Sequence, residues 1–161
     1  MYRTGKSFVR INIDNRKGKK HKMRKIYLLD TNIISEPLKL EPNRNLMEKL
    51  KENGDFCAIS TFTWYEALFG MSCMPEGKRK ERTRNFLLNK VQAFFPIINY
   101  DEHCAFLQWE IQAQMQTKGI IVPDLDLFIA ATAISNNMIL ITHNTKDFKN
   151  IPGLMLEDWI K

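Results

Sequence analysis

The sequence predicts an α/β fold in which a short central parallel sheet is flanked by helices. Two observations support this prediction. Apolar, β-prone runs of about four or five residues recur along the chain, and longer segments with helical spacing of apolar residues separate them. Runs this short and apolar are typical of strands buried on both faces of a parallel sheet. Their alternation with helices indicates an α/β sandwich, and 161 residues suffice for one such domain.

The first half of the chain contains two predicted strands and two predicted helices. We expect a strand at 26–29, a helix at 45–53 that Gly54 ends, and a strand at 56–60. A helix through "WYEALFG" should follow and end at Gly70. Ser60 or Thr63 is its candidate cap, and Ser60 is preferred because a helix beginning at Thr63 would be a stub.

The second half continues the same alternation of strands and helices. The predicted elements are a helix at 78–95 limited by Pro96, a strand at 97–100, a helix at 101–118, a helix at 125–137 after Pro123, a strand at 138–142 and a short strand within 153–159. In a parallel sheet, ligands bind beyond the carboxyl ends of the strands. The residues that follow each strand are therefore the first place to look for chemistry.

Positive charge is concentrated at the N-terminus. Residues 1–25 contain ten of the 24 Lys and Arg but one of the 18 Asp and Glu, so the remainder is mildly acidic. We expect residues 1–22 to be a disordered basic extension and residues 23–161 to be the folded domain. The extension is either an arm that contacts nucleic acid or sequence upstream of a natural start at Met23, and no functional conclusion rests on it.

Several classes of protein are excluded. No apolar run is long enough to span a membrane, and no apolar segment follows the N-terminal charges as in a secretory signal. The three cysteines and three histidines are scattered without the spacing of a zinc site: Cys57, Cys73, Cys104, His21, His103 and His143. So few cysteines suggest buried thiols in a reducing compartment, and we expect a cytoplasmic protein.

Four acidic residues are predicted to meet at the carboxyl edge of the sheet: Asp30 after the first strand, Glu66 on the helix after the second, Asp126 in the first turn of the helix after Pro123, and Asp147 in the loop after the fourth strand. Each also has a purely structural interpretation. These are an Asx-turn at Asp30, a Thr63–Glu66 capping box, a favourable helix-terminus charge at Asp126 and a turn at Asp147. Their coincidence at one edge favours a shared site.

Clustered carboxylates repel one another, and a divalent cation relieves that repulsion. Oxygen ligands without thiolate or imidazole favour Mg²⁺ or Mn²⁺. Such an ion polarises a phosphodiester and activates water for attack on phosphorus, so the expected substrate is nucleic acid. Because no histidine is placed as a general base, we expect the metal to lower the pKa of the attacking water.

Four motifs together resemble, in the correct order, the PIN domain of VapC-type ribonuclease toxins from bacterial toxin–antitoxin modules. They are "LLDTNIIS", "STFTWYEALFG", "DLFIAATAISNNMILITHNTKDF" and "IPGLMLEDW", and the resemblance runs from about Met23 to Trp159. It implies a PIN-like three-layer sandwich and a metal-dependent endoribonuclease. The implied catalytic and metal-binding residues are Asp30, Glu66, Asp126 and Asp147, and the implied supporting polar residues are Thr31, Asn32, Thr142 and Asn144.

The resemblance also implies a homodimer, a cognate antitoxin that covers the active site, and RNA targets such as tRNA. One departure concerns "DLD", where Asp124 stands beside Asp126 and is itself a candidate N-cap. A helix turns by about 100° per residue, so the two acids cannot face a metal equally. We select Asp126 because it directly precedes "LFIAA".

Two other functions remain as alternatives. A non-catalytic PIN-like module that binds RNA or a partner would lack one of the acids, and none is missing. A phosphatase with an aspartate nucleophile would carry a second Asp at position 32, which is Asn. Aromatic residues and the basic run 77–84 are candidate RNA contacts, although helical spacing favours core, dimer or charged-surface roles: Trp64, Tyr65, Phe69, Trp109 and Phe128.

Overall fold

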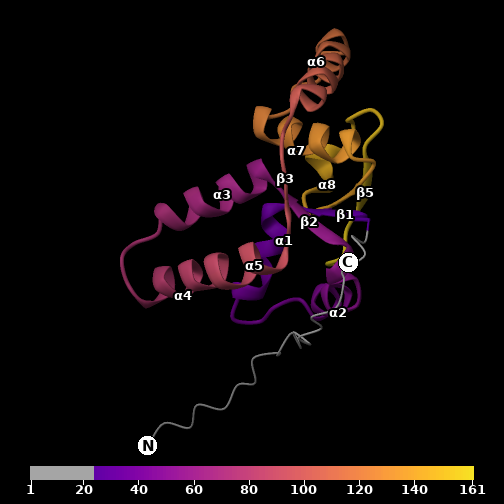
Figure 1. Cartoon of the computed structure of the whole chain (residues 1–161). Coiled ribbons are helices and arrows are strands. Elements are labelled where there is room, and N and C mark those ends of the chain that lie inside the picture. Colours follow the sequence, from indigo (N-terminus) through magenta and orange to yellow (C-terminus); the bar gives the residue numbers. More distant parts are fainter. Residues whose placement is uncertain (1–23) are drawn as a thin grey trace, which may run out of the picture.

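The computed structural model of the chain describes residues 24–161, so the predicted extension of residues 1–22 lies outside the described residues. The five predicted strands are present, each somewhat shorter than expected: β1 (Tyr27–Leu29), β2 (Cys57–Ser60), β3 (Ile97–Ile98), β4 (Ile139–Ile141) and β5 (Met155–Glu157). They form one parallel sheet of order β3-β2-β1-β4-β5. Helices lie on both sides of it (Figure 1).

The central strand of this sheet is β1. Leu29 is paired with Ile59 of β2 on one side and with Ile141 of β4 on the other. The chain builds β2 and β3 on one side of β1, then crosses over to build β4 and β5 on the other. The strand order therefore reverses between β1 and β4, and the crevice at such a reversal is where open parallel sheets bind ligands.

The helices connect successive strands. Between β1 and β2 lie α1 (Thr31–Ser35), the 3₁₀ turn η1 (Glu36–Leu38), α2 (Arg44–Asn53) and the 3₁₀ turn η2 (Gly54–Phe56). Between β2 and β3 lie α3 (Thr61–Ser72), α4 (Lys78–Phe86), the π-helical η3 (Leu87–Val91) and α5 (Gln92–Phe94). Between β3 and β4 lie α6 (Glu102–Thr117) and α7 (Asp124–Ser135), and α8 (Thr145–Phe148) lies between β4 and β5. Helices α3 and α4 form a hairpin that projects from one side of the sheet (Figure 1).

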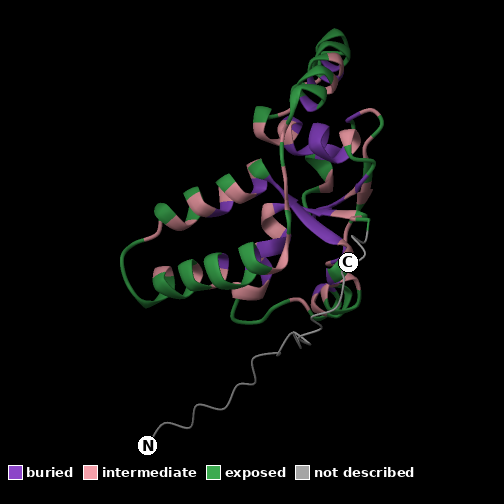
Figure 2. Ribbon diagram, viewed as in Figure 1, coloured by how far each residue is buried: buried purple, intermediate pink, exposed green. Residues whose placement is uncertain are grey.

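Two hydrophobic clusters cover the two faces of the sheet. Leu28 of β1 packs with Ile129 of α7 and Phe148 of α8. Its neighbour Leu29 packs on the opposite face with Ile33 of α1 and with α2 and η3. Adjacent strand residues point to opposite faces, so a continuous apolar run fills both clusters. Figure 2 shows buried strands between helices with exposed outer surfaces, which confirms the predicted three-layer sandwich.

Two local predictions were wrong, and two short helices were not predicted. Gly70 does not end α3, which continues to Ser72, because Gly70 is not among the glycines with positive φ. The short helices α1 and α8 were not predicted, since each begins immediately after polar residues that indicated a turn. Cys57 and Cys104 are buried as expected, but Cys73 is exposed at the turn between α3 and α4.

None of the helices in the part of the chain that the structure describes combines the length and the apolar character needed to cross a bilayer. This agrees with the sequence, in which no apolar run reached that length.

Candidate active site

Asp30 lies at the point where the central strand becomes a helix. Its backbone N–H donates to the carbonyl of Ile141 at 3.0 Å, which extends the pairing of β1 with β4 by one residue. One carboxylate oxygen accepts a hydrogen bond of 2.8 Å from the backbone N–H of Thr31 and caps α1. The Asp30 side chain therefore has a local structural role, as the Asx-turn interpretation expected. Its second oxygen remains directed at the sheet edge, and the residue is only 5% exposed.

That second oxygen is bound by two neutral donors. The hydroxyl of Thr142 donates to it at 2.7 Å and the amide of Asn32 at 2.6 Å. The Thr142 oxygen in turn accepts from the Asn144 backbone N–H at 3.0 Å, and the Asn32 oxygen accepts from the His143 backbone N–H at 3.0 Å. Burial raises the pKa of Asp30, and these hydrogen bonds offset only part of the increase. The network joins β1 to β4 across the reversal of strand order.

Glu66 comes from the next strand-to-helix junction. Ser60 caps α3 by accepting from the Thr63 backbone N–H at 2.9 Å, which confirms Ser60 as the cap and leaves Glu66 on the second turn. The Glu66 carboxylate accepts a hydrogen bond from the Thr31 hydroxyl of α1. Burial raises the pKa of Glu66, and the nearby charge of Asp30 raises it further. The capping-box interpretation is therefore wrong, because Glu66 bonds to α1 instead of its own helix.

The two acids of "DLD" differ in their surroundings. Pro123 occupies the position before α7, and Asp124 is its exposed first residue instead of its cap. Asp126 is half-buried, and its pKa is raised to about 6 by burial and by the charges of Asp30, Asp147 and Glu66. Asp126 is thus within electrostatic range of all three other predicted site residues, which supports its selection over Asp124.

Asp147 lies on α8, not in a loop as predicted, because residues 145–148 form one helical turn after β4. Its carboxylate is exposed and accepts a hydrogen bond of 2.5 Å from the Asn144 amide. The turn interpretation is therefore correct for the Asn144 contact. The charge of Asp147 nevertheless reaches Asp126, so the residue belongs to the same acidic edge.

All eight predicted site residues lie at this edge, and each supporting polar residue contacts an acid or its partner. Within residues 24–161, Asp126 is the member whose carboxylate accepts no hydrogen bond, and none of the four acids has a Lys or Arg partner within 4.0 Å. Several carboxylates held together without a cation fit a divalent ion in charge and in donor chemistry.

The present side-chain positions do not form a ready-made metal cage. No group of three or more His, Cys, Asp or Glu side chains between residues 24 and 161 is arranged to hold a metal ion. The hydrogen bonds that Asp30, Glu66 and Asp147 accept come from neutral donors, so these contacts do not neutralise the charge of the acids. The fit to Mg²⁺ or Mn²⁺ therefore rests on donor chemistry and charge.

Sequence reasoning missed a second polar pair at the same edge. The His143 imidazole lies 3.0 Å from the carboxylate of Asp158, which follows β5 and also lies 3.6 Å from the Lys161 ammonium. Burial opposes ionisation of Asp158, but the Ile160 backbone N–H, His143 and Lys161 outweigh it and lower its pKa. The signal available in the sequence was the position of His143 immediately after the predicted strand at 138–142 and of Asp158 near the end of the segment 153–159 that contains the last predicted strand.

Known proteins with the same pattern identify the family. Residues 27–154 match the PIN domain family. Ribonuclease VapC2 of Rickettsia felis is 34% identical over 138 residues, which cover 84% of this chain and 99% of that protein. The tRNA(fMet)-specific endonuclease VapC of Shigella flexneri is 31% identical, with 83% and 97% coverage.

Solved structures agree with the sequence comparison. The chain superimposes on VapBC2 from Rickettsia felis bound to a promoter DNA fragment with a TM-score of 0.73 at 33% identity, covering 83% of this chain and 98% of the other. For FitAcB from Neisseria gonorrhoeae the TM-score is 0.77 at 28% identity, with 83% and 98% coverage. The chain therefore belongs to the PIN domain family, and within it to the VapC type, as the four sequence motifs predicted.

Proposed function

We propose that this protein is a metal-dependent endoribonuclease and the toxin of a type II toxin–antitoxin module. The observation that carries the proposal is the meeting of Asp30, Glu66, Asp126 and Asp147 at one edge of the sheet, where burial and the other three carboxylates raise the pKa of Asp126 to about 6. Such a group, held with other acids and without a cationic partner, marks a functional site more often than a structural one. The ribonuclease names of the relatives supply the reaction class.

Asp30, Glu66, Asp126 and Asp147 are the residues that would hold Mg²⁺ or Mn²⁺. When bound, such an ion polarises a phosphodiester and lowers the pKa of water. The remaining residues orient the acids: Thr31 holds the Glu66 carboxylate, and Asn32 and Thr142 hold one oxygen of Asp30. Asn144 holds Asp147, so Asp126 is the acid left free of such restraint within residues 24–161.

The proposed partners are a cognate antitoxin, a second copy of the chain and an RNA substrate such as tRNA. The solved relatives are named as complexes of VapB with VapC, which supports an antitoxin. Two relatives are named as tRNA(fMet)-specific, which supports tRNA. Exposed aromatic pairs on α3 (Tyr65 and Phe69) and α6 (Phe106 and Trp109) offer apolar area for a homodimer.

A non-catalytic PIN-like module that binds RNA or a partner is the second candidate. The observation in its favour is that the acids of residues 24–161 are not already arranged as a metal cage. The observation against it is that all four acids are present at one edge.

Cleavage of total cellular RNA by antitoxin-free protein separates the two candidates. Wild type, Asp126→Asn and the matched control Asp124→Asn would be compared in Mg²⁺, Mn²⁺ and EDTA. We expect discrete cuts that require metal, disappear with Asp126→Asn and persist with Asp124→Asn. Calorimetric titration with Mn²⁺ should show binding to wild type and weaker binding to Asp126→Asn. Intact RNA together with no binding of Mn²⁺ by wild type would reject the nuclease and favour the binding module.

A further inference from the structure

An acidic edge is a poor place for a polyanion to bind, so the affinity for RNA requires positive charge elsewhere. Among the described elements α4 is strongly basic, because its sequence "KRKERTRNF" carries five Lys or Arg and one Glu. None of its residues is buried. Phosphate contacts by Lys and Arg supply most of the sequence-independent affinity of proteins for nucleic acids.

Within residues 24–161 four of the five α4 cations have no acidic partner within 4.0 Å, and three of these lie together, because Arg84 falls about 120° or more around the helix from each of the other three. Lys80 is engaged, since its ammonium lies 2.6 Å from Glu76 and 3.2 Å from the Ser72 carbonyl. Lys78, Arg79 and Arg82 are exposed, and within residues 24–161 none of them has an acidic partner within 4.0 Å. We call these three residues the basic face.

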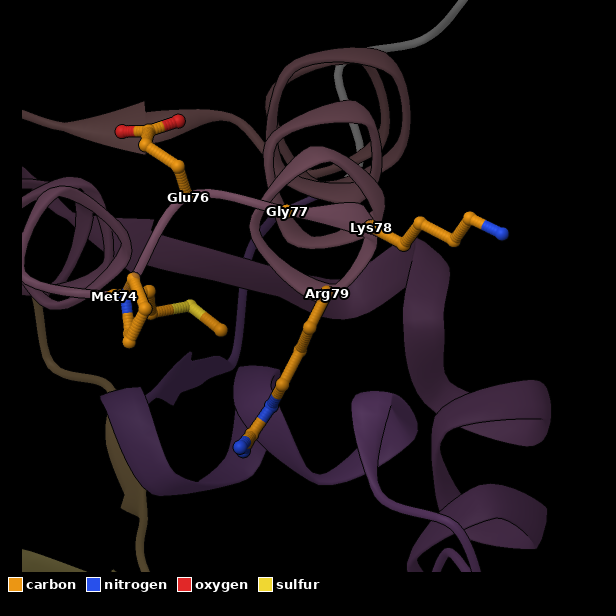
Figure 3. Close-up of a pocket in the computed structure, with 6 residues that line it drawn as sticks. Met74, Glu76, Gly77, Lys78 and Arg79 are labelled. Carbon is orange, nitrogen blue, oxygen red and sulfur yellow. The ribbon is translucent and has the colours of Figure 1, made fainter.

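Helical geometry places the basic face on one side of α4. At about 100° per residue, Lys78, Arg79 and Arg82 fall within an arc of about 100°. Leu87 and Val91 of the continuing helix are buried in the hydrophobic cluster and define its inner side, whereas the partly buried Phe86 falls within the arc of the basic face. Figure 3 shows Lys78 and Arg79 extending away from Glu76 at the tip of the hairpin, where the turn encloses a hollow of about 430 Å³. No predicted site residue lines this hollow.

The α3–α4 hairpin connects the basic face to the acidic edge. Glu66 lies on α3, and Ser72 ends that helix six residues later, about 9 Å further along the axis. Helix α4 then returns alongside α3 toward the sheet (Figure 1). The basic face therefore lies on the helix adjacent to the one that carries Glu66.

We propose that Lys78, Arg79 and Arg82 bind the phosphate backbone of the RNA substrate outside the acidic site. The proposal rests on RNA being the substrate, as proposed above, and adds where that RNA is held. The basic face supplies affinity and the acidic edge supplies chemistry. An acidic protein segment is the competing occupant, and the experiment below includes it.

The test measures binding and cleavage separately. Binding of a fluorescent single-stranded RNA oligonucleotide would be followed in Asp126→Asn protein with EDTA over a series of KCl concentrations. The test variant adds Lys78→Gln, Arg79→Gln and Arg82→Gln. The matched control adds Arg44→Gln, Lys49→Gln and Lys51→Gln on α2, which removes the same charge from another exposed helix. Circular dichroism and thermal unfolding would establish that both variants fold.

We expect the test variant to bind RNA about tenfold more weakly or worse, while the control changes by less than about twofold. The slope of log K against log salt should decrease by about 2, since each phosphate contact to a single strand contributes about 0.7. In otherwise wild-type protein with Mg²⁺, the same three substitutions should raise KM and leave kcat unchanged.

Other outcomes overturn the inference. Equal losses of RNA affinity in the test and control variants would mean that RNA binding depends on net charge and not on the basic face. Binding of fluorescent polyglutamate to the same proteins tests the acidic segment. If the test variant bound RNA as before but no longer bound polyglutamate, the basic face would be assigned to an acidic protein. If the protein with the three substitutions cleaved RNA with the KM of wild type, the basic face would be rejected and the nuclease proposal would stand. Absence of cleavage and of Mn²⁺ binding by wild type, with RNA binding lost only in the test variant, would reject the nuclease and retain the basic face.

Discussion

Asp126 and Asp158 lie near the same edge of the sheet, yet their pKa values move in opposite directions. Asp126 is half-buried and its pKa is raised to about 6. The Asp158 side chain is only 6% exposed, and its pKa is lowered. Burial raises the pKa of both carboxyls, so it cannot explain the difference. The partners explain it, because Asp126 faces other acids whereas Asp158 faces a backbone N–H, His143 and Lys161.

This comparison separates structural acids from functional ones. Glu36, another buried acid, resembles Asp158, because its carboxylate lies 2.5 Å from the Lys39 ammonium and accepts from the Asn43 backbone N–H at 3.1 Å. Paired acids of this kind hold segments together. Acids that face one another lower stability, and a protein tolerates them where the charge is needed for binding or catalysis.

The largest expected effect is on cleavage. Asp126→Asn should reduce kcat/KM for RNA by more than about 100-fold, because it removes one of the charges that would hold the metal. Asp158→Asn should retain activity within a few fold, since its partners are local. Initial rates on a cleaved RNA would measure both. Equal losses in the two variants would remove the distinction between the two kinds of acid.

Thr142→Val should lower the free energy of unfolding by about 2 kcal/mol. The substitution keeps the shape but removes the hydroxyl that donates to Asp30 and accepts from the Asn144 backbone N–H, and Thr142 is fully buried. It should also raise the pKa of Asp30 further. Urea unfolding at pH 7 would measure the loss, and Thr145→Val, at a partly exposed position, is the control. A loss no larger than that of the control would contradict the role of the network.

Asp158→Asn should destabilise the protein by about 1 to 2 kcal/mol at pH 7, because hydrogen bonds to the charged carboxylate are lost. The folded pKa of Asp158 is below its unfolded value. The stabilising contribution of Asp158 to the free energy of unfolding is therefore present above pH 4 and is lost as the pH falls through the folded pKa. Urea unfolding at pH 7 and at pH 3 should show a difference from wild type that shrinks in acid. A difference that grows in acid would show that the sign is wrong.

The effect of Asp126→Asn on the free energy of unfolding at neutral pH should be opposite in sign to that of Asp158→Asn and smaller. The folded pKa of about 6 exceeds the unfolded value of 3.8, so the favourable contribution of Asp126 is complete below pH 4 and is lost as the pH rises through 6. The difference between these two pKa values corresponds to about 3 kcal/mol in the free energy of unfolding. Solvent screening of this half-exposed group reduces the expected effect to about 1 kcal/mol. The variant should therefore be more stable than wild type at pH 7.5 and equal to it at pH 4. Urea unfolding without divalent cations would measure this.

Local patterns were sufficient to predict much of this molecule. The apolar runs at 26–29, 56–60 and 138–142 identified β1, β2 and β4, because a strand buried on both faces has few other compositions. The order Ser60 then Glu66 identified the cap of α3 and placed the acid on its second turn, since capping depends on residues a few positions apart.

Tertiary structure decided what local patterns left open. Helical periodicity could not choose between Asp124 and Asp126, nor could spacing show that Glu66 bonds to Thr31, 35 residues away. The pairing of His143 with Asp158 likewise depends on β4 lying beside β5. A pKa reflects every charge within a few ångströms, whatever its position in the chain. The sequence therefore determined which acids reach the sheet edge, and only folding determined which of them face one another.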